Sequence, residues 1–248
     1  MTNLDSLKDG CNTAVIGATG GIGEAFVECL AEDERVATVH AFSRSPKAST
    51  HAKVTNGVLE LGDEASIAAA AKAASIQSAL DLVIVATGVL HRPPALAPEK
   101  TLRAFDRDAM LEVMDINSIG PALVAKHFLP RLARQRKAVF AVLSARVGSI
   151  TDNRLGGWAA YRMSKAALNM LVRTVAVEQT RASGDALVVA LHPGTVDTAL
   201  SAPFSGRIES AKLFSAEDSV SRLMRTINGL QVGDTGGFFA YDGSRIDF

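Results

Sequence analysis

Tyr161 and Lys165 are the side chains of this 248-residue chain best suited to proton transfer. Residues four apart share one face of a helix, so the phenol and the ammonium can meet in one cleft. A free phenol has a pKa of about 10, and a nearby cation lowers that pKa by favouring the phenolate. The pair predicts an acid–base site, although two tyrosines and nine lysines can also produce this spacing by chance.

Gly17, Gly21 and Gly23 lie between a predicted strand and a predicted helix. Glycine lets the backbone pass close to a phosphate, and the N-terminus of the helix offers unpaired N–H groups to that anion. The G-x-x-x-G-x-G spacing therefore indicates a site for a dinucleotide pyrophosphate. A turn that serves packing alone is the alternative interpretation.

The end of the second predicted strand indicates which dinucleotide binds. Dinucleotide folds that select NAD place an acidic residue here, whereas this chain has Ser43 followed by Arg44, with Lys47 nearby. A guanidinium can bind a 2′-phosphate through two hydrogen bonds. NADP is the predicted cofactor and NAD remains possible; a solvated Arg44 in a surface loop is the alternative.

Apolar, β-branched runs alternate with longer Ala- and Leu-rich segments along the chain. Several of these runs are apolar at consecutive positions, which is typical of parallel strands covered on both faces. Without a linker or a repeat, residues 1–248 are predicted to form a single α/β domain, a doubly wound parallel sheet with helices on both faces. The predicted strands are 13–17, 36–42, 57–61, 80–86, 137–144, 186–192 and 238–241, and the predicted helices are 21–31, 63–75, 106–114, 118–134, 158–182 and 215–228.

Charge and cysteine content narrow the class of partner. Lys plus Arg and Asp plus Glu both total 26, so nucleic acid and anionic membrane have no electrostatic support as partners. Cys11 and Cys29 are too few for a disulfide framework, and no metal-binding spacing is present. Without a signal-peptide core or a membrane-length apolar stretch, we expect a cytoplasmic protein that binds small molecules.

Four motifs, in this order, resemble the short-chain dehydrogenase/reductase family from about Thr13 to the C-terminus. They are the glycine turn, Asn117 in Asp-Ile-Asn, the Tyr161/Lys165 pair, and Pro-Gly-Thr-Val-x-Thr at 193–198. Segments 143–149, 156–158 and 237–243 are similar to the branch of C-factor and sniffer-like carbonyl reductases. The resemblance implies a Rossmann-type sheet of seven parallel strands.

The resemblance also implies hydride transfer between a nicotinamide and the carbonyl or alcohol carbon of a small substrate. In that reaction Tyr161 exchanges a proton with the substrate, and Lys165 holds the nicotinamide ribose and lowers the phenol pKa. Asn117 would connect Lys165 to solvent through a water molecule. The implied cofactor-binding residues are Gly17, Thr19, Gly21, Ile22, Gly23, Ser43, Arg44, Glu60, Leu61, Ala86, Thr87, Gly88, Asn117, Tyr161, Lys165, Pro193, Gly194, Val196 and Thr198.

The chain departs from the family pattern at two places. Segment 85–88 reads Val-Ala-Thr-Gly where the family has Asn-Asn-Ala-Gly, so the asparagine contacts on the adenosine side are absent. Ala145 stands where the family has its catalytic serine, and Ser144 precedes it. Ser144 is the predicted replacement if the backbone bends there; Ser149 and a different donor are the alternatives.

The substrate side of the site is less defined by the sequence. Residues 198–214, which include Phe204 and Ile208, are predicted to form a lid, with an irregular connection as the alternative. Trp158 is a candidate apolar wall or an ordinary packing residue. A small apolar carbonyl compound is the expected substrate.

Two further expectations concern partners and activity. A homo-oligomer, either dimer or tetramer, is expected to pair through apolar faces of the helices after Asn117 and Tyr161. The rival function is a dinucleotide-binding signalling protein of the C-factor type with weak or no turnover. The apolar residues expected on those faces are Leu123, Phe128, Leu168, Leu171 and Val175.

Overall fold

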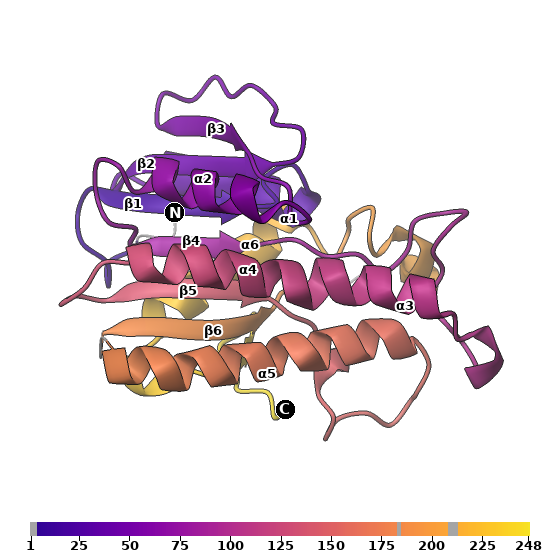
Figure 1. Cartoon of the computed structure of the whole chain (residues 1–248). Coiled ribbons are helices and arrows are strands. Elements are labelled where there is room, and N and C mark those ends of the chain that lie inside the picture. The colour runs from indigo at the N-terminus through magenta and orange to yellow at the C-terminus, as the bar shows by residue number, and fades with distance from the viewer. Residues whose placement is uncertain (1–3, 183–184, 208–212) are drawn as a thin grey trace.

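Seven parallel strands form one sheet in the computed structural model, which describes residues 4–182, 185–207 and 213–248 (Figure 1). The strand order is β3-β2-β1-β4-β5-β6-β9, so the order reverses between β1 and β4. Ligands of open α/β sheets bind outside the carboxyl ends of the strands at such a reversal. The predicted fold class is confirmed. The strands are β1 (Cys11–Ile16), β2 (Val36–Ser43), β3 (Val54–Val58), β4 (Leu82–Val85), β5 (Ala138–Leu143), β6 (Ala186–His192) and β9 (Phe238–Ala240).

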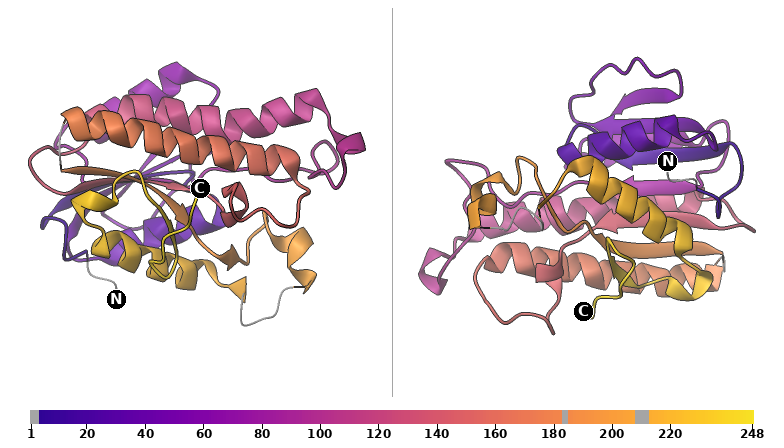
Figure 2. Two further views of the ribbon diagram at one scale, coloured as in Figure 1. Left: turned by 90° about the horizontal axis from the view of Figure 1, so that it is seen from below. Right: turned by 180° about the vertical axis from the view of Figure 1, so that it is seen from behind.

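Helices cover both faces of the sheet. On one face α2, α4 and α5 bury a core that contains Phe128 and Leu168. On the other face α1 and α6 bury Phe26 and Leu223 (Figure 2). No helix within the described ranges is long and apolar enough to cross a membrane. The helices are α1 (Gly21–Glu32), α2 (Glu64–Ala74), α3 (Arg107–Met114), α4 (Gly120–Phe128), α5 (Ala159–Ala182) and α6 (Ala216–Gly229).

The third strand lies three residues earlier than predicted. Strand β3 covers Val54–Val58 rather than 57–61, so Glu60 and Leu61 follow the strand. The apolar signal at 59–61 comes from tertiary packing. Leu59 is buried in the core, and Leu61 lies against Gly120, where an added Cβ would be 3.1 Å from the leucine side chain. Burial without strand pairing explains the error.

The two helices predicted at 106–114 and 118–134 are one continuous helical stretch. A π-helical turn, Asp115–Ile119, joins α3 to α4 and contains the buried Asn117. Such turns widen a helix and are frequent at functional sites. Helix α4 ends at Phe128, followed by a 3-10 turn at Leu129–Arg131, because Pro130 has no N–H to continue the α-helix.

A two-stranded ladder that the sequence analysis did not predict lies beside the carboxyl ends of the main sheet. Its strands, β7 (Thr195–Val196) and β8 (Leu213–Phe214), pair in parallel, so that β8 occupies the last two residues of the predicted lid. A 3-10 turn, Ala202–Arg207, occupies part of the segment between them. Ile208 and the rest of 208–212 lie outside the described residues.

Candidate active site

A cavity of about 700 Å³ opens where β1, β4, β5 and β6 end. It brings together segments that are far apart in the sequence. The glycine turn contributes Gly21 and Ile22, and α5 contributes Tyr161 and Lys165. The remaining walls come from residues 86–91, 143–147, 192–196 and 198–201, with Trp158 and Phe204. This is the edge of the sheet at which the strand order predicts a ligand.

Helix α5 holds Tyr161 and Lys165 together in the wall of this cavity. Both are buried, with 9% and 3% of their surface exposed. The Lys165 ammonium donates a hydrogen bond to the Leu143 carbonyl at 2.8 Å and lies 5.8 Å from the centre of the Tyr161 ring. Among the described residues, none hydrogen-bonds the Tyr161 hydroxyl. That hydroxyl is therefore available to a substrate.

Burial determines the protonation of the pair. Burial raises the pKa of Tyr161 to about 12 and lowers the pKa of Lys165 to about 8. The expected lowering of the phenol pKa by Lys165 is thus outweighed, because the ammonium is directed at the Leu143 carbonyl and the phenol is desolvated. At neutral pH the phenol carries its proton and can donate it.

The start of α5 is capped from a distant loop. The buried Glu99 carboxylate accepts from the Ala160 N–H at 3.3 Å with each oxygen, and the Glu99 carbonyl accepts from the Trp158 N–H at 2.6 Å. A carboxylate at a helix N-terminus is favourable because it meets unpaired N–H groups and the positive end of the helix dipole. Glu99 thereby positions the helical turn that carries Tyr161. The sequence analysis missed it, because no local signal marks a cap 61 residues away.

Asn117 connects three elements at the π-turn. Its Oδ1 accepts from the Val89 N–H at 2.8 Å, and its Nδ2 donates to the Val89 carbonyl at 2.8 Å and to Ser164 Oγ at 3.0 Å. It makes no direct bond to Lys165 within the described residues. The two side chains flank Gly88, where an added Cβ would be 3.4 Å from Asn117 Oδ1 and 3.5 Å from Lys165 Nζ. The link through water stays a prediction.

Ser144 lines the cavity, but its hydroxyl already donates a hydrogen bond within the protein. It donates to Asn169 Oδ1 at 2.7 Å, and Asn169 Nδ2 donates to the Gly148 carbonyl at 3.3 Å. This second bond fixes the orientation of the amide. A hydroxyl has one hydrogen, so Ser144 cannot also donate to a substrate oxygen in this arrangement. Ser149 is buried and outside the residues that line the cavity.

At the glycine turn the backbone lies closer to neighbouring segments than a residue with a Cβ would allow. Gly17 has φ +89°, and a Cβ there would lie 3.0 Å from Ala86 and Thr87. A Cβ on Gly23 would be 2.1 Å from the Gly17 carbonyl oxygen, and one on Gly21 would be 2.9 Å from the Thr198 methyl group. The turn therefore admits only glycine at Gly23 and presents the N-terminus of α1 to the cavity.

Two buried hydroxyls beside this turn have no hydrogen-bond partner among the residues that the structure describes. They belong to Ser43, at the end of β2, and Thr87, two residues after β4. Buried polar groups without partners are rare and indicate a missing ligand or water. Together with the glycine cradle, these hydroxyls fit a ligand rich in hydroxyl and phosphate groups. The residues present therefore fit a bound dinucleotide.

The predicted adenosine end lies outside the cavity lining, on the surface beyond β2 and β3. Arg44 is exposed and makes no hydrogen bond or ion pair with any described residue. Lys47, by contrast, pairs with Glu24 at 3.3 Å. Glu60 is also exposed, and Leu61 is half-buried. Thr19 is half-buried in the turn, outside the residues that line the cavity.

Segment 193–198 lines the cavity beside the glycine turn, with Thr198 next to Gly21. The Pro193 carbonyl accepts from Ser219 on α6 at 2.7 Å. Gly194 has φ +80°, and an added Cβ would lie 2.7 Å from the Phe214 ring and 3.0 Å from Tyr241. Val196 pairs with Phe214 in the small ladder. This packing fixes the segment against the rest of the domain.

An apolar wall covers the end of the cavity near Tyr161. The Trp158 ring contacts the Phe204 ring at 4.9 Å and lies 6.4 Å from the Tyr161 ring. Phe204 in turn lies 5.6 Å from the imidazole of His91, whose Nε2 is 3.1 Å from the Leu200 carbonyl. The predicted wall residue and the predicted lid are thus in contact. The sequence analysis assigned His91 no role here, because a lone histidine gives no signal.

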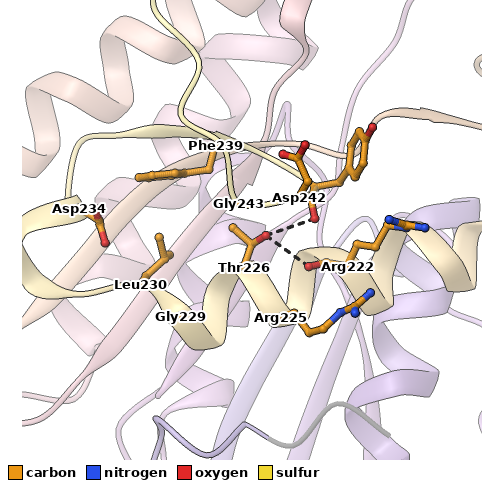
Figure 3. Close-up of a pocket in the computed structure, with 10 residues that line it drawn as sticks. Arg222, Arg225, Thr226, Gly229, Leu230, Asp234, Phe239, Asp242 and Gly243 are labelled. Carbon is orange, nitrogen blue, oxygen red and sulfur yellow. Dashed lines mark hydrogen bonds between the residues drawn. The ribbon is translucent and has the colours of Figure 1, made fainter. Parts of the chain in front are cut away.

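A second cavity, of about 540 Å³, lies between α6 and the segment after β9 (Figure 3). Figure 3 shows Arg222 and Arg225 extending from α6, with Asp242 on the opposite segment. The described residues that line this second cavity do not combine a tyrosine–lysine pair with a glycine turn. We therefore place the chemistry in the first cavity. Tyr241, which packs against Gly194, lies between the two.

Residues 12–207 match the model of a protein family described as short chain dehydrogenase. The chain is a short-chain dehydrogenase. It is an NAD(P)-dependent oxidoreductase, as the resemblance in its motifs implied. The matched range contains the glycine turn, Asn117, the Tyr161/Lys165 pair and the 193–198 segment.

Several known proteins are similar to this short-chain dehydrogenase over half of its length or more. The C-signal of Myxococcus xanthus is 38% identical over 137 residues, which are 55% of this chain and 77% of that protein. A 1-hydroxy-2-glutathionyl-2-methyl-3-butene dehydrogenase of a Rhodococcus species is 28% identical over 94% of this chain and 98% of that enzyme. The structure of an NADPH-bound carbonyl reductase from chicken fatty liver matches with a TM-score of 0.83 at 29% identity, covering 98% of this chain and 96% of that one.

Proposed function

We propose that this short-chain dehydrogenase reduces a small carbonyl compound with NADPH. The observation that carries the proposal is the Tyr161 hydroxyl, which is buried, protonated and without a hydrogen-bond partner among the described residues, in a cavity that begins at a dinucleotide turn. A bound nicotinamide dinucleotide supplies the hydride. Tyr161 polarises the carbonyl oxygen and then protonates it as the alcohol forms.

Lys165 supports this proton transfer. Its ammonium, anchored on the Leu143 carbonyl, stabilises the phenolate that forms when Tyr161 loses its proton. Because Ser144 is bonded to Asn169, Tyr161 polarises the substrate oxygen in this proposal. The Trp158 and Phe204 rings exclude water from the apolar part of the substrate, and Phe204 belongs to the proposed lid. A small apolar aldehyde or ketone fits this wall.

The test is NADPH oxidation by the purified protein with a panel of aromatic and aliphatic aldehydes. We expect turnover that is constant between about pH 6 and 7.5 and falls above about pH 8, where Lys165 loses its proton. The phenol remains protonated over this range, since its pKa is about 12. Alcohol oxidation requires the phenolate and should rise with pH instead.

The similarity to C-signal favours a second candidate, a dinucleotide-binding signalling protein. The hydrogen bond that holds Ser144 is compatible with slow chemistry. Binding of NADPH without oxidation across the whole panel would support the signalling protein and reject the reductase.

Arg44 is proposed to select NADP. Its guanidinium is exposed and has no partner among the described residues, so it can bind the 2′-phosphate. A hydrogen bond to a charged group contributes about 1.5–3 kcal/mol, and we expect Arg44→Ser to raise the KM for NADPH by about 10- to 100-fold. The KM for NADH should change by less than about twofold, because NADH lacks that phosphate. Lys47→Ser is the matched control, since Lys47 pairs with Glu24; an equal effect of Arg44→Ser on both cofactors would contradict the assignment.

A homo-oligomer is proposed to form through α4 and α5, which lie side by side on the outside of one sheet face (Figure 1). Met163, Met170 and Val177 recur every seven residues along α5 and are 51%, 66% and 44% exposed. Phe128 and Leu168, expected on this surface, face the core instead. We expect sedimentation at micromolar concentration to give a dimer or tetramer that Met170→Glu dissociates. A wild-type species of monomer mass would reject this surface.

A further inference from the structure

The active-site cavity carries positive charge that the proposed reaction does not use. Among its described lining residues none is acidic, whereas Arg146 and Lys165 are basic. Lys165 is buried and bonded to the Leu143 carbonyl. Arg146 is therefore the cation in this lining that remains available to a substrate.

The backbone that carries Arg146 is fixed against the helix that carries the acid–base pair. Arg146 begins the 3-10 turn Arg146–Gly148, three residues after the end of β5. The Val147 carbonyl accepts from Arg162 on α5 at 3.2 Å. Gly148 lies against Lys165 so closely that an added Cβ would be 2.7 Å from the lysine Cβ. The backbone and Cβ of Arg146 therefore keep a fixed position relative to Tyr161.

The guanidinium of Arg146, in contrast, is held by a weak ion pair. It is half-exposed and its ion pair is with Asp152, at 3.4 Å, whose carboxylate is also half-exposed. Exposed pairs of this kind contribute little to stability, so another carboxylate can replace Asp152 at low cost. The charge also reaches into the cavity. Burial, aided by the positive charge of Arg146, lowers the pKa of the lining residue His192 to about 4.

We propose that Arg146 binds a carboxylate on the carbonyl substrate, so that the substrate class is apolar aldehydes or ketones that carry a carboxylate. This inference rests on the proposed reductase function and makes it more specific. The apolar wall of Trp158 and Phe204 contacts the apolar part of the substrate, and the Tyr161 hydroxyl donates a hydrogen bond to its carbonyl oxygen. A guanidinium can donate two parallel hydrogen bonds to a carboxylate, which adds orientation as well as affinity.

The experiment compares 4-carboxybenzaldehyde with its neutral methyl ester, methyl 4-formylbenzoate, as substrates with saturating NADPH at low ionic strength. We expect kcat/KM to be about threefold to fivefold higher for the acid in the wild type, because an ion pair with a half-exposed guanidinium contributes up to about 1 kcal/mol, which is about fivefold. Arg146→Gln should bring the ratio of the two values close to one. Asp152→Asn should increase the ratio by about two- to threefold, since it removes the competing carboxylate.

Arg154→Gln is the matched control, because Arg154 is an exposed arginine of the same loop that is outside the cavity lining. It removes the same net charge and should leave the ratio unchanged. An unchanged ratio in Arg146→Gln would overturn the proposal. An equal fall in kcat/KM for both aldehydes, together with a matching rise in the KM for NADPH, would also overturn it. Arg146 would then bind the cofactor and not the substrate.

A binding measurement separates this inference from the reductase function. Calorimetry with the product of 4-carboxybenzaldehyde reduction, 4-(hydroxymethyl)benzoate, on the NADP⁺-loaded protein should give a Kd about threefold to fivefold weaker in Arg146→Gln than in the wild type. The methyl ester of this product should show no such difference. If neither aldehyde is reduced, the proposed function fails, and this titration still decides whether Arg146 binds a carboxylate.

Discussion

Replacing Tyr161 with Phe is expected to lower kcat for carbonyl reduction by about 10²- to 10⁴-fold, the usual contribution of a general acid. The ring stays in place, so its contact with Trp158 and the burial of the site are preserved. Only the hydroxyl that protonates the substrate oxygen is lost. Steady-state kinetics give kcat, and NADPH fluorescence titration should show a Kd within about twofold of the wild type.

Ser144→Ala is the informative comparison for that variant. Its hydroxyl donates to Asn169, so removing it should lower kcat by less than about tenfold. A loss as large as that of Tyr161→Phe would mean that the bond to Asn169 opens when substrate binds. Full activity of Tyr161→Phe would instead show that another group supplies the proton and would reject the proposed role.

Gly23→Ala is expected to abolish dinucleotide binding and to destabilise the fold. The added Cβ would lie 2.1 Å from the Gly17 carbonyl oxygen, which is backbone and cannot rotate away. Relieving this overlap must separate α1 from the turn, with a cost of about 3 kcal/mol, at the upper end of the usual range for overpacking. It also moves the N–H groups at the N-terminus of α1 that would bind the pyrophosphate of a dinucleotide. Urea denaturation gives the free energy of unfolding, and NADPH titration gives a Kd weakened by at least about 100-fold.

Gly62→Ala serves as the control for the effect of a methyl group on a glycine. Nothing lies within 4 Å of the Cβ that it would add, so the free energy of unfolding should change by no more than about 0.5 kcal/mol. Normal NADPH binding by Gly23→Ala would contradict the close packing of the turn.

The sequence alone determined the fold class and predicted several residues that the structure brings together around one cavity. Strand and helix signals depend on residues close together in the chain, and consecutive apolar runs such as Leu82–Val85 are buried on both faces of the sheet. The glycine turn and the i, i+4 pair of Tyr161 and Lys165 are also local patterns, so their spacing predicted their chemistry. Local patterns gave poorer boundaries where burial came without pairing, as at Leu59, or where a π-turn replaced a helix end, as at Asn117.

Only the tertiary structure determined the pKa values and the hydrogen-bond partners of these groups. Burial raised the pKa of Tyr161 to about 12 instead of leaving it lowered by Lys165. Asn169 took the Ser144 hydrogen, and Glu99 capped α5 from a remote loop. Arg146 became part of the cavity wall. Desolvation and hydrogen bonds between segments depend on the distances that folding creates, and no pattern of neighbouring residues encodes those distances.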